Sequence, residues 1–253
     1  MKQIPNLFTL LNLVAGCIAI VLILQTGESL VSADGGTWIT QLPEKIWWGA
    51  ICIGIAAIID FLDGFVARLF KAESAMGKQL DSLADMISFG VAPGLILYQL
   101  LRLSFMQQEN GLDVSVWALA PALIFPCAGA WRLARFNTET SSSKDFKGVP
   151  IPAAGLVVCS LPLILFYNNF NAEVLLLNKW VLYAVILLLS LLMVSETRFM
   201  ALKFTDASIK NNLPAIILLI ASVLAALLFQ WLAIPLVFII YIILSLTSKK
   251  QFK

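Results

Sequence analysis

The sequence predicts an all-α, polytopic membrane helix bundle with about eight transmembrane helices. Of the 253 residues, 60% are hydrophobic and only 13% are charged, whereas an ordinary soluble domain carries about 25% charged residues. Apolar runs close to the ~20 residues needed to cross a bilayer recur along the whole chain. The basic residues also divide unevenly between the two sides that these runs define, which is typical of a membrane protein.

Eight membrane spans are expected, and their even number would place both ends of the chain on one side. The expected spans cover residues 7–25, 47–70, 78–105, 116–136, 151–166, 180–194, 213–229 and 232–246. Only Lys45, Arg102 and Lys179 fall on one side, and the other 14 of the 17 lysines and arginines fall on the opposite side. Because basic residues concentrate in cytoplasmic loops, we expect an integral protein of the cell (inner) membrane with both termini in the cytoplasm.

Composition also excludes some functions. The formal net charge of +2 is too small to indicate nucleic-acid binding. The chain has no histidine, which excludes a His-ligated zinc site and the most common general base.

Four aspartates inside the expected spans are the strongest candidates for chemistry. Asp60 and Asp63 are three residues apart on one expected helix, and Asp81 and Asp85 are four apart on the next. Each pair therefore shares one face of its helix. The two helices run in opposite directions and are joined by a short turn near the cytoplasm, so the pairs should face each other.

These carboxylates need positive charge, because each costs at least about 2.5 kcal/mol inside a bilayer. Only Arg68 and Lys78 lie nearby in the sequence as cations. Oxygen ligands are those that Mg²⁺ or Mn²⁺ prefers, so the sequence predicts a divalent metal site. The alternative is that the aspartates cap helices or pair with these two basic residues.

Small residues follow the same helices. Gly64 and Ala67 come after the second aspartate, and Gly77 opens the next helix. A residue with little or no side chain lets a flat base or a pyrophosphate approach the backbone closely. Close packing between membrane helices is the alternative role for each of them.

Together these residues resemble the signature of the CDP-alcohol phosphatidyltransferase family, in the form Asp60-x2-Asp63-Gly64-x2-Ala67-Arg68-x8-Gly77-x3-Asp81-x3-Asp85. The resemblance implies a multi-helix membrane fold, usually a homodimer, that displaces CMP from a CDP-linked lipid with an alcohol and two divalent ions. It implies the following roles: metal ligands at Asp60, Asp63, Asp81 and Asp85, a general base also at Asp85, and CDP contacts at Asn6, Thr9, Gly64, Ala67, Arg68 and Ser74.

Further motifs resemble the phosphatidylserine synthase branch of this family. They are Ile4-Pro5-Asn6 with Thr9 and Asn12, Ser88-Phe89-Gly90-Val91-Ala92-Pro93, Arg132-Leu133-Ala134-Arg135-Phe136-Asn137, Phe146-Lys147-Gly148-Val149-Pro150-Ile151-Pro152 and Val194-Ser195-Glu196-Thr197-Arg198. The resemblance implies transfer of a phosphatidyl group from CDP-diacylglycerol to L-serine, with release of CMP. It covers residues 1–205, so we expect that region to form the catalytic core. Residues 206–253 should add a pair of transmembrane helices to the same membrane domain.

Three basic residues are candidates for binding the carboxylate of serine. Arg132, Arg135 and Lys147 are expected at the cytoplasmic ends of the fourth and fifth spans, and arginine can hold a carboxylate through two hydrogen bonds. They could equally be ordinary cytoplasmic positive charges. Two other functions stay open: a sister enzyme that uses glycerol 3-phosphate or inositol phosphate, and a cation or solute transporter with an intramembrane acidic site.

Overall fold

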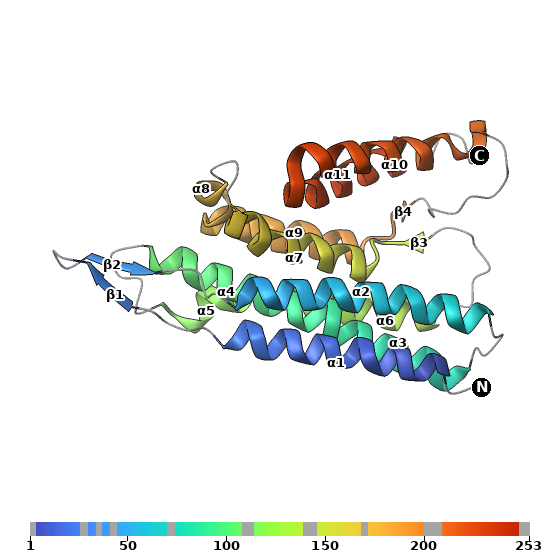
Figure 1. The fold of residues 1–253 in the computed structure, drawn as a ribbon, viewed down its shortest axis with the longest axis horizontal. Helices are drawn as coiled ribbons and strands as arrows, with labels where there is room; N and C mark the ends of the chain where they lie inside the picture. The colour runs from blue at the N-terminus through green and yellow to red at the C-terminus, as the bar shows by residue number, and fades with distance from the viewer. Residues whose placement is uncertain are drawn as a thin grey trace.

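The computed structural model describes residues 4–25, 30–33, 37–40, 45–69, 74–107, 114–138, 146–167, 172–199 and 209–247. Long helices dominate this part of the chain and lie roughly alongside one another (Figure 1). The start of α1 and the end of α11 lie at the same end of the bundle (Figure 1).

The first two helices, α1 (Ile4–Leu24) and α2 (Ile46–Leu69), pack along most of their length. Between them is a short antiparallel hairpin of β1 (Leu30–Ala33) and β2 (Thr37–Thr40), in which Leu30 pairs with Thr40. The sequence analysis did not predict these strands, although their Val, Ile, Thr and Trp residues are common in strands.

The third long helical stretch contains three segments in direct succession: α3 (Ala75–Asp85), the π-helix η1 (Met86–Val91) and α4 (Ala92–Met106). Ser74 caps the start of α3, because its hydroxyl oxygen accepts a 3.0 Å hydrogen bond from the backbone N–H of Gly77. A π-helix adds a residue to one turn and is often found at a functional site. Here it begins directly after Asp85.

The middle of the chain adds five helical segments: α5 (Val116–Leu119), the 3₁₀-helix η3 (Ala120–Leu123), α6 (Ile124–Thr138), α7 (Ile151–Tyr167) and α9 (Lys179–Val194), with the short α8 (Glu173–Leu176) before the last of these. Strands β3 (Phe146–Lys147) and β4 (Arg198–Phe199) pair in antiparallel fashion, with Lys147 opposite Arg198. This pairing ties the start of α7 to the end of α9.

The C-terminal segment is a helical hairpin of α10 (Ile209–Phe229) and α11 (Ala233–Thr247), joined by η4 (Gln230–Leu232). Gln230 has a φ of 50°, a left-handed conformation that reverses the chain. The two helices contact each other, and α11 also packs against α7 and β4. Figure 1 shows the hairpin lying beside α7 and α9, on the side away from α1.

The helical surface fits a membrane environment. Five helical stretches in the described residues are long and apolar enough to span a bilayer, namely Pro5–Leu24, Ile46–Leu69, Ala75–Met106, Val116–Thr138 and Ile216–Thr247, the last of which contains the η4 turn. The apolar helices α7 and α9 are shorter. Small residues allow close contacts inside the bundle: a Cβ at Gly155 would lie 2.9 Å from the carbonyl oxygen of Phe89. The predicted all-α, polytopic membrane fold is confirmed.

Candidate active site

The acidic residues of α2 and α3 converge near the end of the bundle where α1 begins. Asp60 and Asp63 come from α2, and Asp81 comes from the facing turn of α3. Their carboxylate groups can each offer an oxygen so that all three oxygens lie within 4.8 Å of one another. Repulsion between such close charges in a low-dielectric setting is strong, so a bound cation would stabilise this arrangement.

Asp85 is the last residue of α3 and lies about one helical turn beyond Asp81. Its side chain is 9% exposed, and its carboxyl group lies close to that of Asp60. Its Oδ1 atom is buried and has no hydrogen-bond partner among the described residues. A buried carboxylate oxygen normally has a partner, so this atom is available to a ligand, a water or a substrate hydroxyl.

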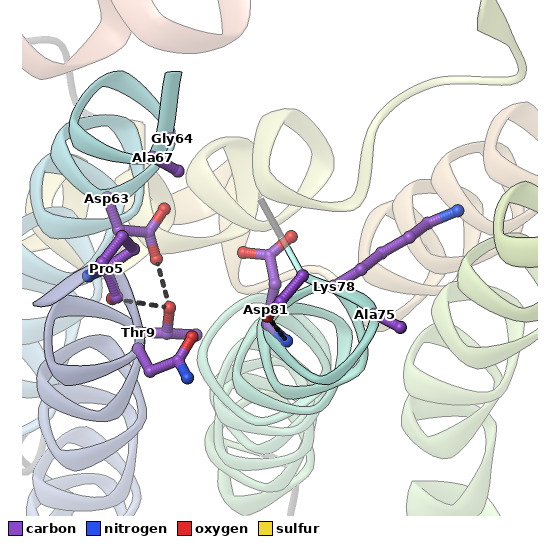
Figure 2. Close-up of a pocket in the computed structure, with 11 residues that line it drawn as sticks. Pro5, Thr9, Asp63, Gly64, Ala67, Ala75, Lys78 and Asp81 are labelled. Atoms are coloured by element: carbon purple, nitrogen blue, oxygen red, sulfur yellow. Dashed lines mark hydrogen bonds between the residues drawn. The ribbon is translucent and has the colours of Figure 1, made fainter. Parts of the chain in front are cut away.

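Among the described residues, none of these four aspartates is neutralised by a salt bridge to a lysine or arginine. Lys78 lies next to the site, but its ammonium group points away from Asp63 and Asp81 (Figure 2) and lies 5.6 Å from the ring centroid of Phe136. Arg68 is exposed on the last turn of α2. The donor set consists of carboxylate oxygens, which fit a hard divalent cation such as Mg²⁺ or Mn²⁺.

A cavity of about 460 Å³ opens beside the aspartates, between α1, α2 and α3. Figure 2 shows Asp63 and Asp81 on opposite sides of this space, with Thr9 beneath Asp63. The hydroxyl of Thr9 donates a 2.8 Å hydrogen bond to Asp63 Oδ2 and lies 3.2 Å from the carbonyl oxygen of Pro5. The lining residues are Pro5, Asn6, Thr9, Asp63, Gly64, Ala67, Ser74, Ala75, Gly77, Lys78 and Asp81.

The missing side chain has a different structural consequence at each of the two glycines that line this cavity, Gly64 and Gly77. A Cβ added at Gly64 would meet no protein atom within 4 Å, so helix packing does not explain this glycine. At Gly77 a Cβ would lie 3.0 Å from Ser74 Oγ and 3.1 Å from Asn6 Oδ1. Gly64 therefore keeps the cavity open, whereas Gly77 lets α1 and the start of α3 approach each other.

Of the six residues predicted to contact CDP, five line the cavity: Asn6, Thr9, Gly64, Ala67 and Ser74. Arg68 does not line it, so its contact with the diphosphate stays a prediction. Pro5 and Ala75 also line the cavity and were not predicted; each directly adjoins a residue that was. Their side chains carry no functional group, so only their position next to Asn6 and Ser74 in the sequence could have indicated them.

The three predicted acceptor residues have different surroundings in the structure. Arg132 on α6 is 8% exposed, and its Nε atom has no hydrogen-bond partner among the described residues. Its guanidinium lies within electrostatic range of the Asp85 carboxyl. Arg135 instead forms a 3.0 Å salt bridge with Glu196 and lies 3.4 Å from the carbonyl oxygen of Val194. Lys147 is on β3, opposite Arg198.

Tyr241 on α11 was missed by the sequence analysis. Its phenol is within electrostatic range of Arg132 and is hydrogen-bonded to Ser245, and its ring stacks on Phe199 with centroids 6.2 Å apart. No motif surrounds Tyr241, and its contacts bring together segments that are far apart in the chain. A lone tyrosine in an apolar helix was the only available signal.

The protein-family model for CDP-alcohol phosphatidyltransferase matches residues 2–189. The chain belongs to the CDP-alcohol phosphatidyltransferase family. The match contains the aspartates, the cavity residues and the three basic candidates, and it ends before α10 and α11.

Several curated proteins are similar to this chain over about 170 residues. A CDP-diacylglycerol–serine O-phosphatidyltransferase of Helicobacter pylori (strain 26695) is 41% identical over 168 residues, which is 64% of this chain and 63% of that protein. One of Bacillus subtilis (strain 168) is 34% identical over 170 residues, 66% of this chain and 78% of that protein. An archaetidylserine synthase of Methanothermobacter thermautotrophicus is 32% identical over 173 residues, 67% of this chain and 61% of that protein. This chain thus spans slightly less than two thirds of the length of the Helicobacter relative.

Proposed function

We propose that this protein is a CDP-diacylglycerol–serine O-phosphatidyltransferase, which forms phosphatidylserine and CMP. The observation that carries the proposal is the convergence of carboxylate oxygens of Asp60, Asp63 and Asp81 within 4.8 Å of one another, beside a cavity that Gly64, Ala67 and Gly77 of the same signature line. The names of the relatives from Helicobacter, Bacillus and Methanothermobacter all contain serine, although the last names a different lipid.

Asp60, Asp63, Asp81 and Asp85 would hold the divalent metal, in keeping with their oxygen-only donor set and with the absence of a salt bridge to them among the described residues. When bound, Mg²⁺ or Mn²⁺, as two ions in our proposal, supplies positive charge to the transferred phosphoryl group and to the leaving oxygen of CMP. Thr9 supports this role of the cluster, because its hydrogen bond fixes one oxygen of Asp63 and leaves the other for a ligand.

The cavity would hold the CDP part of the donor lipid. On one side of the cavity, Gly64 and Ala67 leave the face of α2 without bulky side chains. On the other side, the hydroxyl of Ser74 and the amide of Asn6 provide polar groups. Arg68, on the last turn of α2, would reach the diphosphate from outside the cavity with its long side chain. These contacts would place the phosphorus beside the aspartates.

Asp85 would accept the proton of the serine hydroxyl. As that proton leaves, the hydroxyl oxygen bonds to the lipid-side phosphorus, and the bond from this phosphorus to the CMP oxygen breaks. The unpartnered Oδ1 of Asp85 supports this role, since it can receive a hydrogen bond from the acceptor. Arg132, buried within range of Asp85, would bind the carboxylate of serine.

A sister activity with glycerol 3-phosphate or inositol phosphate is less well supported. A doubly charged phosphate group should require several buried cations, whereas of the three basic candidates only Arg132 is buried, and Arg135 is neutralised by Glu196. Membership of a phosphatidyltransferase family also gives no support to the transporter interpretation.

An acceptor panel tests the proposal. Purified protein would receive CDP-diacylglycerol, Mn²⁺ and one of L-serine, glycerol 3-phosphate, inositol phosphate or glycerol, and CMP and lipid products would be measured. We expect CMP and phosphatidylserine in equal amounts with serine only. Glu173→Gln, on the exposed α8, serves as a control that should match the wild type. Turnover of glycerol 3-phosphate without serine turnover would replace the proposed acceptor.

We also propose that the active site and both termini face the cytoplasm and that the enzyme is a homodimer. Lys45 donates a hydrogen bond to Gln25, and Lys179 lies 5.1 Å from the ring centroid of Phe105, so basic residues of the minority side sit at helix ends remote from the aspartates. Reporter fusions at both ends of the chain should report a cytoplasmic location; fusions on opposite sides would contradict the span count. Cross-linking in native membranes should trap a dimer.

A further inference from the structure

Asn12 is a fully buried amide that the proposed reaction does not yet use. It lies on α1 with 0% exposure, and neither its Oδ1 nor its Nδ2 atom has a hydrogen-bond partner among the described residues. Burying such a group without a partner costs about 1–3 kcal/mol, so a native structure seldom keeps one without a ligand, a water or a functional reason.

Contacts on either side place Asn12 on the part of α1 that faces the helix carrying Asp85. Near the start of α1, the side chain of Asn6 approaches Gly77, and further along the backbone carbonyl of Asn12 accepts a 3.1 Å hydrogen bond from the Ser88 hydroxyl. Because α1 and α3 contact each other between these points, Asp85 lies in the stretch that α1 covers. Ser88 follows Asp85 by three residues, about one helical turn.

Helix α1 and the π-helix η1 approach each other closely at the level of Ser88. A Cβ added at Gly16 would lie only 2.3 Å from Ser88 Oγ and 2.9 Å from its Cα, so α1 and the π-helix are in direct backbone contact. The side chain of a helical residue leans toward the N-terminus of its helix. Asn12 therefore leans toward the aspartate end of the bundle, where Thr9, one turn earlier on α1, holds Asp63.

We propose that Asn12 is a positioning residue for Asp85. Its amide N–H would hold Asp85 Oδ1 through one bound water molecule, which leaves the second lone pair of this oxygen for the acceptor hydroxyl, while Asp60 lies beside the carboxyl group on α2. Such a water would have two polar neighbours, the amide of Asn12 and Oδ1 of Asp85, which is within the range found for buried waters. This inference rests on the proposed role of Asp85 and adds a residue outside the acidic signature.

The test compares Asn12→Leu and Asn12→Asp with the wild type in four measurements: kcat, the KM values for both substrates, Mn²⁺ affinity and Tm. Leucine fills similar space without a polar group, and aspartate keeps the shape but loses the donor. We expect kcat to fall about 10–100-fold in both variants, the usual effect of removing a group that orients a ligand. The KM values and the Mn²⁺ affinity should stay within about 2-fold for Asn12→Leu, and its Tm should not fall.

Ser190→Ala provides the matched control. Ser190 is also buried (5% exposed), also lacks a partner for its Oγ atom among the described residues, and lies on α9 away from the aspartates. Its kcat should match that of the wild type. Asn12→Leu with a raised Tm and wild-type kcat would overturn the proposal, as would a loss of Mn²⁺ affinity that parallels the loss of rate. If the wild type used another acceptor, the proposed substrate would fail, and the same comparison with that acceptor would still decide the role of Asn12.

Discussion

The acidic and basic parts of the candidate site differ in what satisfies their charges. Four aspartates from two helices gather without a salt bridge among the described residues. On α6, Arg132 and Arg135 are three residues apart, yet Arg132 is buried with an unpartnered Nε and Arg135 is paired with Glu196. The salt bridge of Arg135 stabilises the fold, whereas the buried Nε of Arg132, which has no hydrogen-bond partner among the described residues, is available to a ligand.

The largest expected effect comes from removing one charge of the acidic part. Asp60→Asn, Asp63→Asn and Asp81→Asn should each lower the rate of CMP release on the order of 10²–10³-fold or more, because charge stabilisation in the transition state is lost. Asparagine keeps the shape, so the folded yield in detergent should stay close to that of the wild type. A fully active Asp63→Asn enzyme would contradict the proposed role of the acidic part, because its charge would then not be required for catalysis.

In the basic part, we expect Arg132 to act in serine binding and Arg135 to have only a structural role. Arg132→Lys keeps the charge but loses the planar fork, so the KM for serine should rise about 10-fold while kcat changes little. Arg135→Lys and Lys147→Ala should leave the KM for serine within about 2-fold of the wild-type value. Serine saturation curves at fixed CDP-diacylglycerol measure all three. An unchanged KM in every variant would move the acceptor site elsewhere.

A smaller effect is expected where the cavity wall is made of glycine. Gly64 and Gly54 are both on α2, and a Cβ added at either would meet no protein atom within 4 Å. Alanine at either position should stabilise the helix by up to about 1 kcal/mol. Only Gly64→Ala adds a methyl group to the cavity, so only this variant should raise the KM for CDP-diacylglycerol, by several-fold. Equal KM values for CDP-diacylglycerol in the two variants would show that CDP does not bind in this cavity.

Helical periodicity was sufficient to predict the acidic part. The spacing of Asp60 with Asp63, and of Asp81 with Asp85, fixes the helix face, and the hydropathy of the chain predicts that the helices are antiparallel neighbours. Apolar length likewise predicted the membrane bundle, which the structure confirms. These features depend on interactions that are local in the chain.

The remaining features depend on contacts between distant segments. The π-helix after Asp85 is packed against α1 through Gly16 and against α7 through Gly155, and neither contact can be derived from the local sequence. The choice between Arg132 and Arg135 depends on Glu196, some 60 residues further along the chain. The approach of Tyr241 to Arg132 requires the α10–α11 hairpin to fold back on the core.

The most direct test of the central claim is a metal titration of the wild-type protein and Asp60→Asn. Protein stripped with a chelator would be supplied with increasing Mn²⁺, and bound Mn²⁺ and the rate of CMP release from CDP-diacylglycerol with serine would be measured in the same samples. We expect no rate in the stripped protein, a rate that rises with bound Mn²⁺ in the wild type, and weaker binding without recovered rate in Asp60→Asn. Full wild-type activity in excess chelator would contradict the account.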